Sequence, residues 1–195
     1  MKLILGSQSI GRKEVLTAAG YDFEIMVADI DEKVIRDDNY ELLPLLIARE
    51  KTKALLSKIQ EDAVLITSDQ VVVCNGELRE KPVDQNEART WLRSYAFYPS
   101  RAITSVIVAN TITGKQVEGV DIVDVIFDKI PDEVIEKLIA QGRILKTAGA
   151  CIAEDPLLNP HIRELHGDLD SITGLPMRLT KELLSQVGFT QDQEA

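Results

Sequence analysis

One aspartate lies inside a run of strand-forming residues, where its charge is costly. Asp69 is flanked by Val64-Leu65-Ile66-Thr67-Ser68 and by Gln70-Val71-Val72-Val73. β-Branched residues on both sides favour a buried strand, in which aspartate is rare. A buried carboxylate needs a metal, a cation or hydrogen bonds to offset its lost hydration. Asp69 is therefore a candidate metal ligand or general base. The alternative is a strand that ends at Thr67, with Ser68 and Asp69 in a turn.

The segment Leu5-Gly6-Ser7-Gln8-Ser9-Ile10-Gly11-Arg12-Lys13 combines a strand end, a turn of small residues and a helix start. The free N–H groups and the positive dipole end of a helix N-terminus attract anions. Arg12 and Lys13 add two full positive charges, although cations in a first turn are slightly unfavourable by themselves. A bound phosphate would reverse that effect. The alternative is a solvated turn with two exposed cations.

A third candidate is Lys81, which precedes Pro82 and follows the hairpin signal Asn75-Gly76. The hairpin turns the chain back, so we expect Lys81 to approach the level of Asp69. Such a lysine forms either a weak surface ion pair or a phosphate contact.

Carboxylates and two further lysines complete the candidates. Asp29-Ile30-Asp31-Glu32 supplies oxygen ligands of the kind that hard divalent cations prefer, although acidic loops are common. Lys51 and Lys53 lie in a helix with apolar residues almost all the way round. Its periodicity does not show which of them points inward.

Two other kinds of site fit the sequence less well. Gly6 and Gly11 have the spacing of a phosphate-binding P-loop, but Arg12-Lys13 stands where that motif needs Lys and then Ser or Thr. The hydroxyl that would hold magnesium is therefore absent. Ser7 and His166 could form a hydrolase pair, but no G-x-S-x-G turn surrounds Ser7 and nothing fixes a base near it.

Strands and helices that would position these residues follow from periodicity and turn signals. We expect strands over 2–5, 23–28, 63–74, 103–110 and 119–127. We expect helices from the N-cap Ser9 to Gly20, over 41–59, after the Asp84-x-x-Glu87 box, around 134–139 before Gly142, and from Pro176 to 187, with His161 and His166 in a late loop. Strands joined by helices and by hairpins predict an α/β fold with a mixed central β-sheet flanked by helices. Without repeats or linkers, residues 1–195 are expected to form a single domain.

The composition is that of a globular protein, with 45% hydrophobic and 28% charged residues. No apolar run reaches the roughly 18 residues that a membrane span needs. The apolar stretch at the N-terminus is too short for a secretory signal. Cys74 and Cys151 lie far apart in the sequence, which favours free thiols in a reducing compartment. We therefore expect a cytoplasmic protein. The net charge of −10 argues against nucleic acid and anionic membranes as partners, but not against a small anionic ligand.

Taken together, these segments resemble the Maf family of nucleotide pyrophosphatases. The family pattern Ser-x-Ser-Pro-Arg-Arg-x-x-Leu-Leu is similar to residues 7–16, and an Asp-Glu pair, an Ala-x-x-Lys helix and a Ser/Ala-Asp-x-Val-Val strand follow it. These correspond to Asp31-Glu32, Ala48 to Lys51, and Ser68 to Val72, and are followed by Lys81-Pro82, Ala148-Gly149 and Gly174-Leu175-Pro176. The matches keep their order from near residue 3 to near residue 187, which makes the set specific although no single motif is.

The resemblance implies a fold similar to inosine triphosphate pyrophosphatases, often dimeric, with a nucleoside triphosphate as substrate and a divalent metal, Mg²⁺ or Mn²⁺, as cofactor. It implies release of a nucleoside monophosphate and pyrophosphate. By residue-wise transfer, Asp69, Lys81 and Arg12 are catalytic, with Asp69 as proton acceptor, and Glu32 and Asp69 hold the metal. Substrate contacts fall to Ser7, Arg12, Lys13, Lys51, Gln70, Lys81 and Glu154.

Specificity is expected at Gly11, Gln70 and Glu154. Gln70 and Glu154 resemble the subfamily acting on 7-methyl-GTP, whereas the one acting on dTTP and UTP carries Thr and Gln there. The chain departs from the family pattern at Ile10 (usually Pro), Gly11 (usually larger) and Lys13 (usually Arg). Lysine at position 13 keeps the charge but cannot form the bidentate hydrogen bonds of a guanidinium.

Three other interpretations stay open. One is a dTTP/UTP pyrophosphatase, and another is a nucleotide-binding regulator that has kept the residues but lost turnover. The third, a P-loop phosphotransferase, would transfer the γ-phosphoryl group and release no pyrophosphate.

Overall fold

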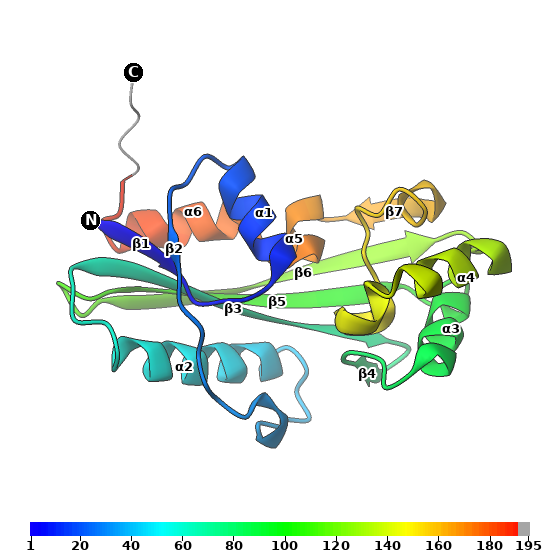
Figure 1. Ribbon diagram of the computed structural model, residues 1–195, viewed down its shortest axis with the longest axis horizontal. Coiled ribbons are helices and arrows are strands. Elements are labelled where there is room, and N and C mark those ends of the chain that lie inside the picture. Colours follow the sequence, from blue (N-terminus) through cyan, green and yellow to red (C-terminus); the bar gives the residue numbers. More distant parts are fainter. Residues whose placement is uncertain (191–195) are drawn as a thin grey trace. The chain divides into compact units, whose positions relative to one another are not determined.

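The β-branched run around Asp69 forms one uninterrupted strand, β3 (Ala63–Cys74), in the computed structural model, which describes residues 1–190 (Figure 1). The interpretation in which the strand ends at Thr67 is therefore wrong. The hydrogen-bonded strand order is β2-β1-β3-β5-β6-β7, and β4 also pairs with β3. β1 pairs in parallel with β2 and β3, whereas the β3–β4 and β6–β7 pairs are antiparallel, so the predicted mixed sheet is confirmed. The other strands are β1 (Lys2–Leu5), β2 (Glu24–Ile25), β4 (Glu77–Arg79), β5 (Ser100–Asn110), β6 (Gln116–Phe127) and β7 (Ile162–His166).

The chain divides into two compact units. Among the described residues, unit 1 comprises residues 1–69, 104–121 and 174–190, and unit 2 comprises residues 70–103 and 122–173. Strands β3, β5 and β6 each contribute residues to both units. The prediction of one domain over 1–195 includes residues 191–195, which lie outside the described residues, and it stays a prediction.

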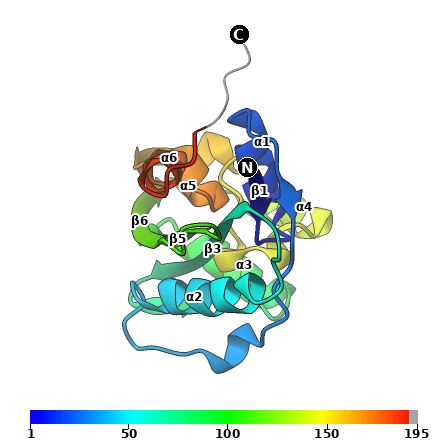
Figure 2. The same cartoon turned by 90° about the vertical axis from the view of Figure 1, so that its left-hand side faces the viewer.

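Unit 1 packs helices on both faces of its strands. Helix α2 (Leu43–Leu56) covers one face, and α1 (Ile10–Ala18) and α6 (Met177–Gln186) cover the opposite face (Figures 1 and 2). A one-turn 3₁₀ helix, η1 (Glu32–Val34), lies between β2 and α2 in the chain. Two apolar clusters fill the layers; the larger contains Leu3, Leu5, Leu16, Val64, Ile66, Val106, Val108, Leu175, Met177, Leu183, Leu184 and Val187.

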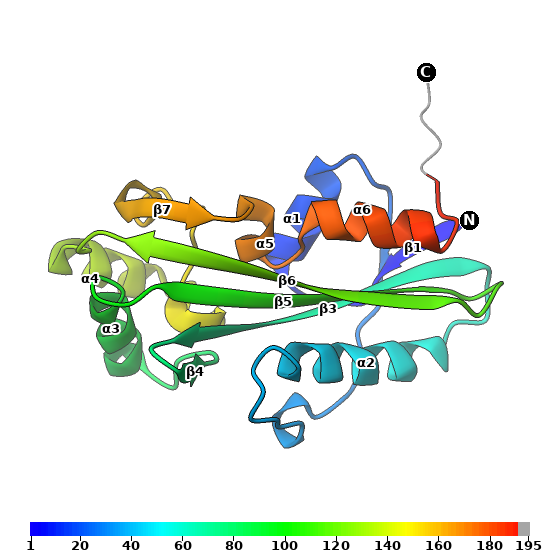
Figure 3. The same cartoon turned by 180° about the vertical axis from the view of Figure 1, so that it is seen from behind.

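Unit 2 has its own apolar core, which includes Trp91, Tyr95, Phe127 and Leu138. Helices α3 (Gln85–Ser94) and α4 (Asp132–Gln141) lie side by side (Figure 3) and are joined by Arg89–Glu136 and Arg93–Asp132 ion pairs. The remaining elements are the short helix α5 (Leu169–Thr173) and the 3₁₀ turns η2 (Ile144–Lys146), η3 (Ala148–Ala150) and η4 (Asn159–His161).

Several local signals act as the sequence predicts. The Ser9 hydroxyl accepts a hydrogen bond from the Arg12 backbone N–H and caps α1. Asp84 accepts from the N–H groups of Asn86 and Glu87 and caps α3 in the same way. Gly142 ends α4 with a positive φ of 72°, a conformation that glycine adopts without steric cost.

Weak periodicity explains where the predictions were wrong. The strand expected over 23–28 contains only Glu24–Ile25, because its pairing with β1 stops after two residues. The segment expected to be a loop contains β7, whose pairing with β6 includes His166 opposite Asp124. Its sequence does not alternate between apolar and polar residues, and most of its side chains are exposed.

Within residues 1–190, no helix is both long enough and apolar enough to cross a membrane. Both cysteines are free, as the sequence predicts, and both are buried.

Gly6, directly after β1, lies unusually close to β3. Its backbone N–H donates to the Ile66 carbonyl at 2.7 Å, which places the chain directly against β3. A Cβ atom at this position would lie 2.6 Å from Leu55 Cδ1, 2.8 Å from Thr67 Cγ2 and 3.2 Å from the Ile66 carbonyl oxygen. The close approach therefore requires a residue without a side chain.

We expect Gly6→Ala to lower the free energy of unfolding by about 1–3 kcal/mol, because the added methyl group forces β1 and β3 apart. Urea denaturation measures the loss. Val34→Ala, at a side chain that is 74% exposed, is the control and should change stability by less than about 0.5 kcal/mol. Equal stabilities of Gly6→Ala and the control would show that the contact is not tight.

Candidate functional site

One ammonium group joins two acidic side chains in unit 1. Lys51 Nζ lies 2.7 Å from Asp69 Oδ1 and 2.9 Å from Glu32 Oε1. The side chains of Lys51 and Asp69 are only 10% and 12% exposed, whereas that of Glu32 is 49% exposed. The pairing provides the compensating cation that the buried Asp69 requires.

Helix α2 places Lys51, and not Lys53, beside Asp69. Leu43, Ile47, Ala48 and Leu55 face the sheet, and Lys51 lies on the same buried stripe, four residues from Ile47 and from Leu55. Lys53 is exposed. Periodicity did not show which of the two lysines points inward; the packing of the buried stripe of α2 on β3 selects Lys51.

Burial and neighbouring charges act on Asp69 in opposite directions. Burial raises the pKa of Asp69 above its ordinary value, and the positive charges of Lys51 and Arg12 partly oppose this shift. Asp69 Oδ2 has no hydrogen-bond partner within residues 1–190, so this oxygen is available to a metal ion or a water molecule.

The turn after β1 brings the Ser7 hydroxyl and the Arg12 guanidinium together. The Ser7 hydroxyl oxygen accepts from the Ser9 N–H at 3.1 Å and from Arg12 Nη1 at 3.2 Å. With both acceptor positions used, its remaining capacity is to donate its own proton. No acceptor within the described residues takes that proton.

Arg12 is buried and held through two of its three nitrogens. Its Nε donates to the Gly174 carbonyl at 2.9 Å and its Nη1 donates to the Ser68 carbonyl at 2.8 Å. The remaining N–H groups of the guanidinium have no partner within residues 1–190. Burial lowers the pKa of Arg12, and the charges of Asp69 and Glu32 act against that shift. A buried cation with unused donors is suited to bind phosphate.

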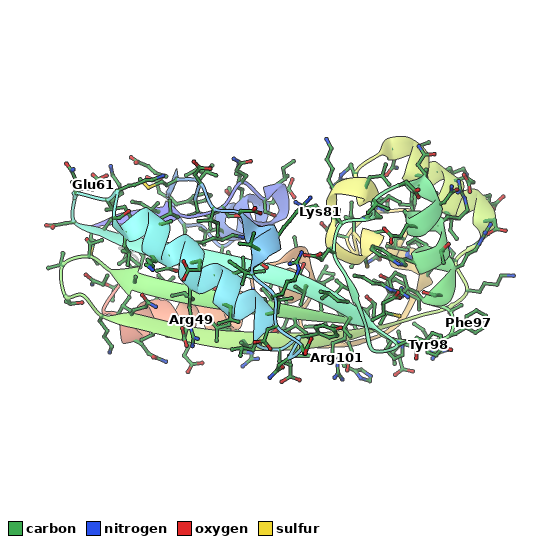
Figure 4. All side chains as sticks on the ribbon, turned by 90° about the horizontal axis from the view of Figure 1, so that it is seen from below. Arg49, Glu61, Lys81, Phe97, Tyr98 and Arg101 are labelled. Atoms are coloured by element: carbon green, nitrogen blue, oxygen red, sulfur yellow. The ribbon has the colours of Figure 1, made fainter. Side chains whose placement is uncertain are left out.

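The other predicted site residues are divided between the units. Gly11 and Lys13 lie half-buried in α1 of unit 1, beside Arg12. Gln70, Lys81 and Glu154 belong to unit 2. Lys81 is exposed (Figure 4), and so is Glu154. The roles of all these residues stay predictions.

The hairpin that precedes Lys81 is confirmed, but its ladder is short. Asn75 and Gly76 both have positive φ, and β3 pairs with β4 from Val72–Arg79 to Cys74–Glu77. Because β4 ends at Arg79, the expected strand pairing does not extend to Lys81.

Within unit 2, hydrogen bonds to backbone carbonyl groups hold Gln70 and the Ala148-Gly149 segment, both of which the family resemblance singles out. Gln70 Nε2 donates to the carbonyl groups of Ser171 and Ile172 at 2.9 and 3.1 Å. The Gly149 N–H donates to the Glu80 carbonyl at 3.0 Å, and the Tyr95 hydroxyl donates to the Gly149 carbonyl at 2.6 Å. The segment that carries Ala148-Gly149 is thereby tied to the residue before Lys81.

Several residues without a predicted role lie beside Arg12, Lys51 and Asp69. The Ser68 hydroxyl donates to the same Gly174 carbonyl that accepts from Arg12. Thr52 and Thr67 place their hydroxyl oxygens 2.5 Å apart between α2 and β3. The detectable signal was that Thr67 and Asp69, two residues apart in a strand, share one face.

The acidic side chains fit a magnesium site only in part. Mg²⁺ is usually bound by one or two carboxylates together with substrate phosphates and water, and Glu32 and Asp69 supply two carboxylates that both lie beside the Lys51 ammonium. Within residues 1–190, no three His, Cys, Asp or Glu side chains come together as a metal site. The substrate would therefore have to supply further ligands.

Removing the shared ammonium should destabilise the protein. We expect Lys51→Met to lower the free energy of unfolding by about 3 kcal/mol, because Asp69 then stays buried without its hydrogen-bonded cation. In an Asp69→Asn background the same change should cost much less, since the amide needs no cation.

Urea denaturation of the four proteins of this cycle measures the coupling. Lys53→Met, on the exposed side of the same helix, is the control and should be neutral within about 0.5 kcal/mol. An equal cost of Lys51→Met in both backgrounds would contradict the pairing.

Comparison with known proteins identifies the family. The family model described as Maf-like protein matches residues 2–187. A 7-methyl-GTP pyrophosphatase of Dictyostelium discoideum is 48% identical over 192 residues, covering 95% of this chain and 96% of that protein. A dTTP/UTP pyrophosphatase of Alkaliphilus metalliredigens is 32% identical over 183 residues, covering 94% of each.

Among solved structures, a nucleoside-triphosphatase (dITP/XTP pyrophosphatase) of Mycobacterium abscessus matches with a TM-score of 0.40 and 14% identity, over 67% of this chain and 75% of that chain. The family model and the two sequence relatives each span nearly the whole sequence, and together they show that the chain belongs to the Maf-like protein family.

Proposed function

We propose that this protein is a nucleoside triphosphate pyrophosphatase that hydrolyses its substrate to a nucleoside monophosphate and pyrophosphate. The observation that carries the proposal is the arrangement of Arg12 and Asp69 around one residue. Arg12, with unused N–H donors, is held by the carbonyl of Ser68, and the next residue is Asp69, with an unused carboxylate oxygen. An anion-binding group and a proton acceptor thus lie together, which is what hydrolysis of a phosphate anhydride requires.

The proposed reaction is attack of water on the α-phosphorus. The bond from that phosphorus to the bridging oxygen breaks, and pyrophosphate leaves with the electron pair. Asp69 orients the water and accepts its proton, a role for which a raised pKa is favourable. Arg12 and Lys51, together with the hydroxyl proton of Ser7, offset the negative charge that builds on the phosphate oxygens.

We propose that Glu32 and Asp69 hold a divalent cation, Mg²⁺ or Mn²⁺. Carboxylate oxygens are ligands that both ions accept, and two carboxylates already approach one positive charge, that of Lys51. When bound, such an ion would supply further neutralisation of phosphate charge.

For the base, we propose 7-methylguanine as the preferred substrate group. The relative of Dictyostelium discoideum, named a 7-methyl-GTP pyrophosphatase, supports this choice because it is more similar to the chain than the dTTP/UTP relative. Gln70 and Glu154, which the family resemblance assigns to base selection, are the proposed specificity residues, with Gly11. Lys13 and Lys81 are proposed as phosphate contacts.

We further propose a single Maf-like domain that contains both units, which the match over residues 2–187 supports. The two buried, free thiols support a reducing setting, which we take to be the cytoplasm. A homodimer and the absence of nucleic-acid or membrane partners complete the proposal; the net charge of −10 supports the latter.

Asp69→Asn should reduce turnover by about 10²- to 10⁴-fold, because the amide cannot accept the proton of water. Steady-state pyrophosphate release and circular dichroism test this together, and the spectrum should stay that of the wild type. Asp22→Asn, at an exposed position, is the matched control and should keep full turnover. An active Asp69→Asn protein would refute the assignment of the proton acceptor.

A substrate panel tests the reaction and the base separately. Pyrophosphate release is measured with magnesium or manganese across dTTP, UTP, CTP, GTP and 7-methyl-GTP, and we expect the highest kcat/KM for 7-methyl-GTP. A lead of dTTP or UTP would keep the enzyme but refute the assignment of Gln70 and Glu154.

The same panel also separates the rival functions. If nucleotides bind but no triphosphate yields pyrophosphate, the protein is better described as a nucleotide-binding regulator. Formation of a nucleoside diphosphate would instead indicate transfer of the γ-phosphoryl group.

A further inference from the structure

Helix α2 is attached to the sheet by buried hydroxyl groups as well as by apolar contacts. The Thr52 hydroxyl donates to the Ala48 carbonyl of its own helix at 2.8 Å and lies 2.5 Å from the Thr67 hydroxyl on β3. Thr67 also lies within 3.3 Å of the Ala48 carbonyl. Thr52 and Thr67 are 1% and 0% exposed, so water does not compete for these bonds.

This hydroxyl pair lies next to the pair that the proposed chemistry uses. Thr52 follows Lys51 in the helix, and Thr67 precedes Asp69 by two residues on the same face of β3. The two helix–strand contacts, Thr52–Thr67 and Lys51–Asp69, are therefore neighbours. Any movement of α2 along or about its axis changes both distances.

The orientation of Thr67 is fixed from its other side. Its methyl group faces Gly6, where an added Cβ would lie only 2.8 Å from it. The Thr67 hydroxyl group is directed to the Thr52 hydroxyl and the Ala48 carbonyl of α2. A third buried hydroxyl, that of Ser105 on β5, lies 2.8 Å from the Pro44 carbonyl at the start of α2 and 3.5 Å from the Asp69 carbonyl.

Other contacts of α2 position it less well. Apolar packing is not directional. The ion pair of Arg49 with Glu118 on β6 lies on an exposed side of the helix (Figure 4), where water and salt weaken it. A short hydrogen bond between buried hydroxyl groups restricts both distance and angle.

We propose that the Thr52–Thr67 pair is a positioning device that sets Lys51 Nζ against the Asp69 carboxylate. This inference rests on the proposed function for its effect on turnover. Neither threonine contacts the reacting atoms, so both act only through Lys51 and Asp69.

The test replaces both hydroxyls by methyl groups of similar shape, in Thr52→Val/Thr67→Val. Because both partners become apolar together, the melting temperature should stay near that of the wild type. We expect kcat for the best triphosphate of the panel to fall about 10- to 100-fold with KM within about twofold, since a misplaced pair slows the chemical step more than binding.

Two control variants separate positioning from general damage. Thr180→Val removes an equally buried hydroxyl of α6, which donates to the Pro176 carbonyl four residues earlier in the chain, and this variant should keep kcat. Thr52→Ser/Thr67→Ser retains the hydroxyl pair and should keep kcat as well. If the double valine variant does not fold, Thr52→Ala/Thr67→Ala, which adds no volume, carries the same test.

A second measurement does not depend on turnover. The coupling free energy between Lys51→Met and Asp69→Asn, measured by urea denaturation, should fall by at least about half in the double valine background. An unchanged kcat, or a lower kcat with unchanged coupling, would overturn the inference. If the wild type releases no pyrophosphate, the proposed function fails, and the coupling alone then decides the positioning role.

Discussion

Asp69 can stay charged inside unit 1 only because a lysine from another element reaches it. Burial raises the pKa of its carboxyl group, and the nearest opposing charge is that of Lys51, 2.7 Å away. Burying a carboxylate costs several kcal/mol unless a well-placed partner compensates it. Apolar packing alone therefore does not determine the position of α2 on β3, because the helix must also place the Lys51 ammonium beside Asp69.

The same constraint explains why polar atoms interrupt an otherwise apolar layer. Ser68 and Gly174 use backbone carbonyls to hold Arg12, and the Ser68 hydroxyl supports the Gly174 carbonyl from a second direction. Each of these groups would be costly if buried alone. Together they satisfy one another at Nε and Nη1 of the guanidinium and leave the N–H groups of Nη2 for a ligand.

How far the sequence predicts the structure depends on how strong the local signals are. The run of β-branched residues predicts β3 with its observed bounds, and Asn75-Gly76 predicts the hairpin after it. Periodicity could not choose between Lys51 and Lys53, because the choice depends on the face of α2 that packs on the sheet. It also missed β7, which is held by pairing with β6 rather than by an apolar pattern of its own. The candidate residues were found by residue type, whereas the type of the neighbouring threonines and carbonyls does not mark them. Only the shared strand face links Thr67 to Asp69 in the sequence.

The register of β3 connects these observations. Residues that alternate along a strand face opposite sides, so Thr67 and Asp69 point to α2, and Ser68 points the other way, toward the Gly174 carbonyl that also binds Arg12. A shift of one residue would exchange the two sets and bring Ser68 to Lys51. Pairing with β1 from Lys2–Ala63 to Leu5–Ile66 opposes such a shift, and so does the close contact at Gly6. The apolar residues of β1 and β3 thus determine, several residues away, which charged groups can meet.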